Sequence, residues 1–219
     1  NTYDVTPQLQ KENAIGVILG NGRFYTMRQN YKPYKIPTFG YPKLRLNLII
    51  EYTDGSRQTI ASDISWKLTT EGPIRSNNEY DGEEYDARKE LGDWNRTGYD
   101  DTNWIPAGRV SIPSGTLRAQ MMPGMKVTES LKPVSIRKQG DKHILDIGQN
   151  MAGWLRIRIK GQAGDSIRLR FAERLQADGE IFTKNLRDAH CTDIYVVSGR
   201  EPQDTTWAPR FVYHGFRYV

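Results

Sequence analysis

The stretch 77–104 concentrates the side chains of this sequence that are able to do chemistry. Its first half is crowded with carboxylate and amide side chains, and Trp94 and Trp104 lie in its second half. Oxygen atoms of these types are the ligands of Ca²⁺, which takes about six to eight of them. The stretch therefore predicts a calcium site, with ligands from Asn77, Asn78, Glu79 and Asp81.

The opening of this stretch, 77–82, superficially resembles the first half of an EF-hand loop. The residue that would have to be the closing glutamate is Arg88, and no amphipathic helical pattern flanks the loop. An EF-hand is therefore excluded, while a calcium site in the loop of a β-sandwich stays open. The alternative is a solvated acidic loop in which Asp86 pairs with Arg88.

Carboxylate pairs of the same stretch are the side chains that glycoside hydrolysis requires, one as acid and one as base. Asp81 with Asp86, or Glu83 with Glu84, would be the pairs, but nothing in the sequence places either across a substrate-sized cleft. The sequence has no G-x-S-x-G motif, no phosphate-binding glycine loop and no zinc-ligand spacing. We therefore predict no catalytic residue in this chain.

Aromatic residues make up 11% of the sequence, and aromatic rings exposed in loops are platforms for sugar rings. Trp66 and Trp154 lie inside strand-like patterns, which predicts that they are core residues. Trp94 lies between Asp93 and Asn95, so we expect its ring to be exposed. The sequence therefore offers Trp94 as a carbohydrate-binding residue.

The net charge of +5 raises the question of nucleic-acid binding. The basic residues of 154–160 and 167–171, however, alternate with apolar residues, a pattern typical of half-buried strands with a solvated face. We expect no nucleic-acid partner. No apolar run approaches the roughly 20 residues of a membrane helix, so we expect no membrane partner. No signal peptide is visible, and the localisation stays unknown.

The single cysteine, Cys191, excludes an internal disulfide framework. It follows His190, and neighbouring residues of a strand point to opposite faces. The two side chains could therefore not easily share a metal ion, and we expect a packed thiol.

Short alternating segments separated by turn residues run through most of the chain. They predict an all-β protein with two antiparallel β-sandwich domains in tandem. A Pro- and Gly-rich stretch around 114–123 indicates the boundary, which gives domains 1–115 and 116–219. The expected strands are 14–19, 44–50, 57–60, 65–68, 134–136, 143–147, 154–159, 167–173, 181–182, 193–197 and 211–219. A short helix is expected to start at 5–7, with Thr6 as its cap and Pro7 at its first position. A hairpin turn is expected at 54–55 and a long loop over 25–41.

Several uncommon strings occur in the order seen in bacterial α-L-rhamnosidases. YDGEEYDAR at 80–88 and YDDTNW at 99–104 resemble the N-terminal region of these enzymes. DIGQNMAGW at 146–154, FAE at 171–173, TKNLR at 183–187 and PRFVYHGFRYV at 209–219 resemble their adjoining sandwich domain. The resemblance spans the chain from about residue 2 to its last residue.

The resemblance implies a jelly-roll, carbohydrate-binding type of module followed by a concanavalin-like sandwich. In this family the acid and base belong to a helical (α/α)6 domain, which we expect to be absent, so that the chain is inactive and its partner is its own catalytic domain. Some family modules bind L-rhamnose through calcium next to the Y-D-G-E string, where this chain has Asn77 and Asn78. A rhamnose-containing glycan is therefore an expected ligand at these residues, with calcium as the only expected cofactor.

Two further expectations follow from the resemblance. We expect the module to lack its first strands, which would leave 14–19 and 44–50 as open sheet edges. The parent enzyme is expected to be bacterial and periplasmic or secreted. The alternative to glycan binding is a purely structural scaffold between domains, with no ligand of its own.

Overall fold

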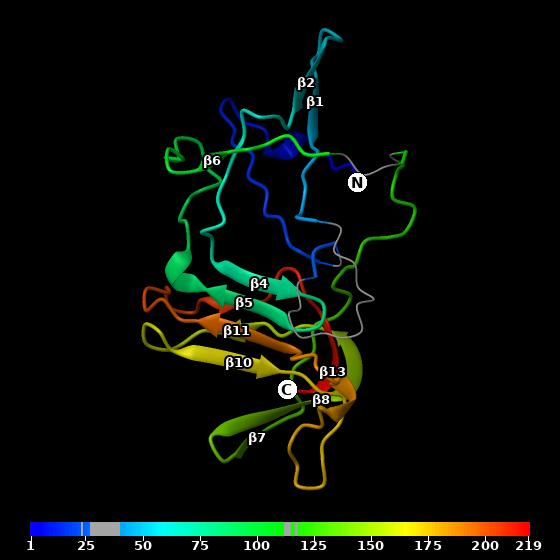
Figure 1. The fold of residues 1–219 in the computed structure, drawn as a ribbon, viewed down its shortest axis with the longest axis vertical. Coiled ribbons are helices and arrows are strands. Elements are labelled where there is room, and N and C mark those ends of the chain that lie inside the picture. The colour runs from blue at the N-terminus through cyan, green and yellow to red at the C-terminus, as the bar shows by residue number, and fades with distance from the viewer. Residues whose placement is uncertain (23, 27–39, 112–114, 117) are drawn as a thin grey trace. The chain divides into compact units, whose positions relative to one another are not determined.

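The protein is all-β, as the alternation predicts, and its described residues contain no α-helix (Figure 1). The computed structural model describes residues 1–22, 24–26, 40–111, 115, 116 and 118–219. Short 3-10 helices lie at η1 (Thr6–Gln8), η2 (Ala87–Lys89) and η3 (Lys184–Leu186). The first is the short helix expected to start near Pro7, although Val5 rather than Thr6 occupies its N-cap position and no side chain caps it. Within the described ranges, no helix has the length and apolar character needed to cross a bilayer.

The chain forms two compact units, and each is made of separate segments. Unit 1 comprises Asn1–Leu19, Pro42–Glu71 and Leu91–Met125, and unit 2 comprises Gly20–Tyr41, Gly72–Glu90 and Lys126–Val219. The predicted domains 1–115 and 116–219 are continuous in sequence. In the structure, Gly72–Glu90 comes from the first half of the chain but belongs to unit 2, together with most of the second half. Most of the long loop expected over 25–41, and part of the expected boundary around 114–123, lie outside the described residues.

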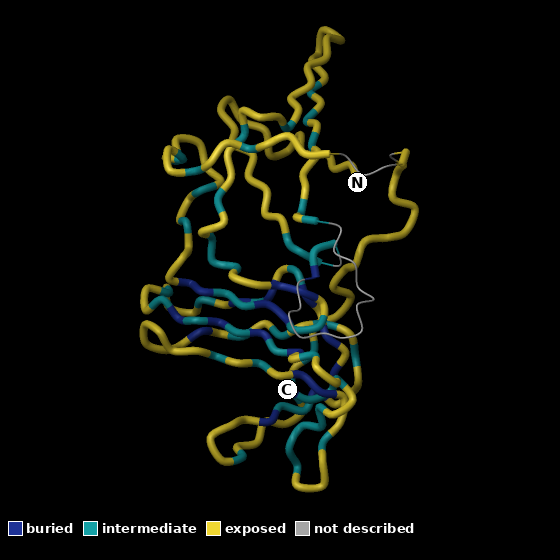
Figure 2. Tube along the Cα trace, in the orientation of Figure 1, coloured by how far each residue is buried: buried dark blue, intermediate teal, exposed yellow. Residues whose placement is uncertain are grey.

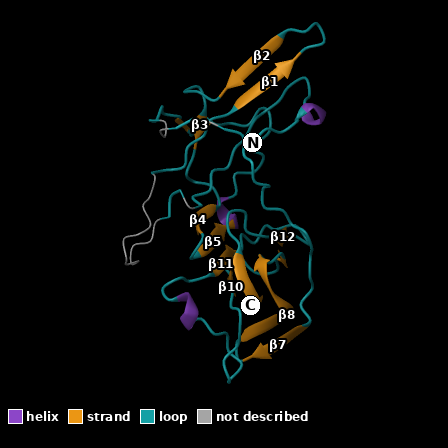
Figure 3. Ribbon diagram, turned by 90° about the vertical axis from the view of Figure 1, so that its right-hand side faces the viewer, coloured by secondary structure: helices purple, strands orange, loops and turns teal. Residues whose placement is uncertain are grey.

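Unit 1 is built around one hairpin, and Figure 3 shows loop around its few strands. Strands β1 (Asn47–Glu51) and β2 (Arg57–Ala61) pair in antiparallel register across the predicted turn, where Gly55 has a φ of +83°. A short ladder joins β3 (Lys67–Leu68) to β6 (Ile105–Pro106). The expected strand 14–19 is wrong, because no described strand pairs with this segment and a strand is defined by its ladder.

Unit 2 contains a four-stranded sheet in the order β10-β11-β5-β4, from Ser166–Arg170, Thr192–Val196, Gly82–Asp86 and Ile74–Asn78. Strands β4 and β5 form a hairpin, so most of 74–86, where a loop was expected, is strand. Its second strand pairs in parallel with β11, the one parallel ladder among the described strands. This ladder joins Gly72–Glu90 to the C-terminal half of the chain.

A three-stranded antiparallel sheet, β13-β8-β7, completes the main framework of unit 2 (Figure 1). Its strands are β13 (His214–Tyr218), β8 (Lys142–Gly153) and β7 (Ser135–Gln139), and a two-stranded ladder joins β9 (Ile157–Arg158) to β12 (Thr206–Trp207). Seven of the expected segments of the second half therefore contain described strands or a bridge. The remaining expected residues extend beyond the ladders, because alternation marks the faces of a strand rather than its ends.

Two apolar clusters form the core of unit 2, which is buried in Figure 2. The first gathers around Tyr195 and Val197, and the second around Phe171 and Phe216, while Leu169 of β10 packs against both. The predicted alternation holds here: Ile157 and Ile159 turn inward, and the basic residues that alternate with them are exposed, namely Arg156, Arg158 and Lys160. The basic residues of these strands therefore form a solvated face.

Candidate functional site

The predicted carbohydrate and calcium residues lie at the β4–β5 hairpin of unit 2. Asn77 and Asn78 are buried in the strand β4, and Glu79 is exposed at the turn. The Oδ1 atom of Asn77 accepts a hydrogen bond from the backbone N–H of Asn21 at 2.7 Å. The Asn77 carbonyl also accepts from the Asn21 amide at 3.2 Å. Asn77 therefore connects the β4–β5 hairpin to Asn21, which lies far earlier in the sequence.

Asn78 closes the turn of the hairpin from within. Its Oδ1 atom accepts hydrogen bonds from the backbone N–H groups of Tyr80 at 2.9 Å and Asp81 at 2.8 Å. Its amide donates to Asp81 Oδ2 at 3.1 Å. This is the local turn bonding for which asparagine is suited.

Asp81 connects the same turn to the segment before β11. Its Oδ1 atom accepts from the backbone N–H of His190 at 3.2 Å, and its carbonyl accepts from that of Thr192 at 2.9 Å. A cation at this hairpin would have to displace several of these hydrogen bonds. No group of three or more His, Cys, Asp or Glu side chains suited to a metal occurs in the described part of the chain. Calcium binding here stays a prediction.

Several other carboxylates of the acidic stretch have structural partners or diverge. Asp86 receives two hydrogen bonds of 2.8 Å from the Arg88 guanidinium, the pairing that the solvated-loop alternative expected. These bonds lower the pKa of Asp86. Glu83 and Glu84 are neighbours in β5 and therefore project to opposite faces of the sheet.

Glu83 is 1% exposed and is held by backbone donors from the far end of the chain. Its carboxylate accepts from the N–H of Arg210 at 3.1 Å and from that of Phe211 at 3.0 Å. Burial raises the pKa of Glu83, and these donors oppose the rise. The carboxylate thus fixes the segment before β13 against the strand β5.

A row of buried polar side chains continues from this point. Asp193 Oδ1 accepts from the backbone N–H of Glu83 and lies 3.0 Å from His214 Nε2, and His214 Nδ1 lies 3.4 Å from Cys191 Sγ. The imidazole also stacks on Phe171 at 4.1 Å between ring centroids. Burial alone would lower the pKa of His214, but the bonds to Asp193 and Cys191 raise it to about 9. The imidazole is therefore a cation at neutral pH, paired with Asp193.

This row links three strands of unit 2, because Asp193 lies in β11, His214 in β13 and Glu83 in β5. The other oxygen of Asp193, Oδ2, is buried and receives no hydrogen bond from the described residues. Cys191 is a buried thiol, as expected, but its histidine partner is His214 rather than His190. The roles of Asp193 and His214 were not predicted from the sequence. A signal was present, because each lies two residues from an inward apolar residue, Tyr195 or Phe216, so that alternation places it on the buried face, where a charged group requires a partner.

Trp94 belongs to unit 1 and is half-buried rather than exposed. Its ring lies 6.2 Å from that of Trp104, and a Cβ atom added to Gly16 would stand 2.4 Å from the Trp94 ring. The indole therefore covers backbone at Gly16. Its predicted sugar contact stays a prediction, and Trp94 does not share a compact unit with Asn77 and Asn78.

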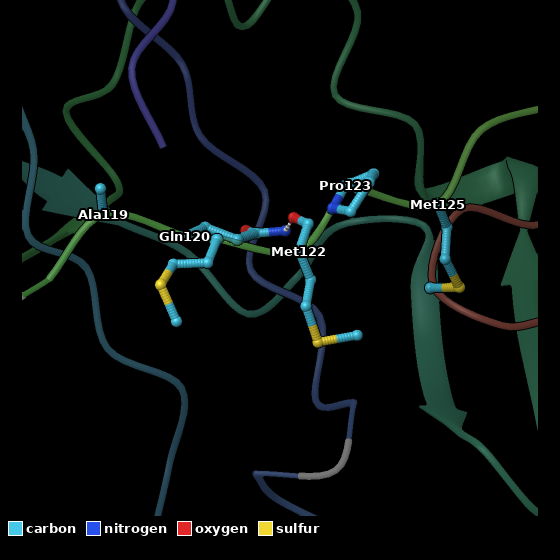
Figure 4. Close-up of a pocket in the computed structure, with 7 residues that line it drawn as sticks. Ala119, Gln120, Met122, Pro123 and Met125 are labelled. Atoms are coloured by element: carbon cyan, nitrogen blue, oxygen red, sulfur yellow. Dashed lines mark hydrogen bonds between the residues drawn. The ribbon is translucent and has the colours of Figure 1, made fainter.

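A shallow hollow in unit 1 is lined by the consecutive residues 119–125, drawn in Figure 4. Its methionines are strongly exposed, with Met121 at 97%. Apart from the amide of Gln120, which donates to the Met122 carbonyl, the hollow presents apolar side chains of one segment. It holds no arrangement of groups that could do chemistry.

Comparisons with known proteins agree with the motifs. Residues 1–129 match the model of the α-L-rhamnosidase N-terminal domain, and residues 136–219 match that of the bacterial α-L-rhamnosidase concanavalin-like domain. An α-L-rhamnosidase of Formosa agariphila is 37% identical over 99% of the chain, and one of Streptomyces avermitilis is 38% identical over all of it. The chain spans 24% and 21% of the length of these curated relatives.

Solved structures show the same likeness. The α-L-rhamnosidase from Dictyoglumus thermophilum has a TM-score of 0.80 and 37% identity, over 91% of this chain and 21% of that one. The Streptomyces avermitilis enzyme complexed with L-rhamnose has a TM-score of 0.74 and 39% identity, over 78% of this chain and 17% of that one.

Proposed function

Because the chain belongs to the α-L-rhamnosidase family through its N-terminal and concanavalin-like domains, we propose that it is a non-catalytic accessory portion of such an enzyme. In this role it supports a catalytic domain of the same protein and binds rhamnose-containing glycans. The hydrolysis of α-L-rhamnosides belongs to the whole enzyme.

One observation carries this proposal. The two family matches are to the N-terminal and the concanavalin-like domain, and together they account for nearly all of the chain. The described residues contain no α-helix from which a helical catalytic barrel could be built. Two of the carboxylates considered for hydrolysis have structural partners: Asp86 pairs with Arg88, and Glu83 accepts from the backbone of Arg210.

Turnover of an aryl α-L-rhamnoside tests the catalytic part of the proposal. The 219-residue chain is expected to release no chromophore above a buffer blank. Release that disappears in Glu83→Gln or Asp86→Asn, while both variants keep the wild-type circular dichroism spectrum, would contradict the proposal.

Calorimetry with L-rhamnose tests the predicted ligand site at the hairpin. If calcium and sugar bind there, affinity falls on addition of a chelator and in Asn78→Ala. The second candidate function, a scaffold without a ligand, is favoured by the internal hydrogen bonds of Asn77, Asn78 and Asp81. A chain that binds no sugar with or without calcium would support this scaffold.

A further inference from the structure

The outer face of the β8–β13 ladder in unit 2 carries two exposed aromatic rings. His214 pairs with Gly153, and the residues that flank this pair are Tyr213 and Trp154. His214 points into the core, so alternation places both flanking side chains on the opposite face. Trp154 is 37% exposed and Tyr213 49%, which agrees with this placement. The prediction that Trp154 is a core residue is therefore wrong.

The floor beside these rings carries no bulky side chain. Ala152 pairs with Gly215. These two residues lie on the same face as Trp154 and Tyr213, two positions further into the strands. Neither has a side chain that would rise between the strands and block access to the rings. An open surface bordered by aromatic rings is suited to the C–H face of a pyranose ring.

Polar groups reach the same floor from a bulge. Register shifts between Phe216 and Tyr218, and the bulged part of β8 carries Asn150, which is exposed. Bulges re-aim side chains and are frequent beside binding sites. The Asn150 amide donates to Glu173 Oε1 at 3.4 Å, and this oxygen lies 4.0 Å from where a Cβ atom of Gly215 would stand. The pair supplies amide and carboxylate partners for sugar hydroxyls.

We propose that this outer face is a carbohydrate-binding site, in which Trp154 and Tyr213 pack against a neutral sugar ring and Asn150 with Glu173 hydrogen-bonds its hydroxyls. It lies in the concanavalin-like half of the chain and uses none of the residues that were predicted from the sequence to bind carbohydrate or calcium. The choice of L-rhamnose as its sugar rests on the proposed function, whereas the aromatic and polar groups do not.

Titration of the 219-residue chain with methyl α-L-rhamnopyranoside, followed by NMR, tests this site. In the wild type we expect saturable shifts of the Trp154 indole N–H and the Gly215 amide. Trp154→Ala and Tyr213→Ala are each expected to weaken binding at least about tenfold, as loss of a stacking ring does. Trp154→Phe should retain most of the affinity, because it keeps an aromatic ring.

Tyr52→Ala is the matched control, because Tyr52 is exposed to 48%, nearly as much as Tyr213, but belongs to unit 1. It should bind as the wild type does. Absence of shifts at Trp154 and Gly215 in the wild type would overturn the site, as would binding that Asn78→Ala or Trp94→Ala weakens and Trp154→Ala does not. Each of these results leaves the non-catalytic role intact, whereas turnover of an aryl rhamnoside by the chain would contradict that role alone.

Discussion

The two compact units differ in what they bury. Every residue classed as buried in the described chain, apolar or polar, belongs to unit 2, including Phe171, Phe216, Glu83 and His214. In unit 1 the large apolar side chains are at best half-buried, and Ile49 of its hairpin is 55% exposed. A hairpin without a covered apolar face is marginal in water, whereas two sheets sharing a core are stable. Unit 2 therefore carries the stability of the chain.

The largest expected difference between the two units comes from a substitution that creates a cavity in unit 2. Phe216 is fully buried and packs edge-on against Phe171 at 4.8 Å between centroids. Phe216→Ala is expected to lower the free energy of unfolding by about 3–5 kcal/mol. Ile49→Ala, the control in unit 1, should cost less than about 1 kcal/mol. Urea denaturation of both variants gives the two values, and equal losses would contradict the contrast.

A second test uses the buried charge of unit 2. The pKa of His214 is raised from 6.5 to about 9, so its protonation stabilises the fold fully below pH 6.5. This stabilisation is lost as the pH rises toward 9, and it amounts to up to about 3 kcal/mol. The stability advantage of the wild type over His214→Gln should therefore shrink between pH 6.5 and pH 9. Denaturation curves at both pH values measure it, and a constant or growing advantage would show that the imidazole is neutral in the fold.

The smallest expected effect on stability concerns the turn of the β4–β5 hairpin in unit 2. Asn78→Ala removes two hydrogen bonds to the backbone of the turn and should lower stability by about 1–2 kcal/mol. Asn78→Asp keeps both acceptors and is expected to stay close to wild type. Thermal melting of the two variants checks this. Equal melting temperatures for Asn78→Ala and the wild type would show that the hydrogen bonds of Asn78 do not stabilise the fold.

The sequence predicts more of the fold than of the site, and the reason is physical. Alternation reveals faces, so the inward row around Ile157 and Ile159 and the hairpin at Gly55 are confirmed. It does not reveal partners, so the parallel pairing of β5 with β11 was not predictable. The strands β4 and β5 were not predicted, because the sequence of 77–86 is rich in acidic residues, which are typical of loops. Their side chains accept hydrogen bonds from backbone N–H groups that lie far away in the sequence. The family motifs indicated the correct family without indicating what their residues contact.

Native-state hydrogen exchange of the 219-residue chain tests the contrast between the two units most directly. We expect slow exchange, near the global limit, for amides of β5, β11 and β13 in unit 2. In unit 1 we expect fast exchange, with modest protection confined to the ladder of β1 and β2. Uniformly slow exchange in both units of a monomeric sample would contradict the account, because it would mean that unit 1 has a stable core of its own.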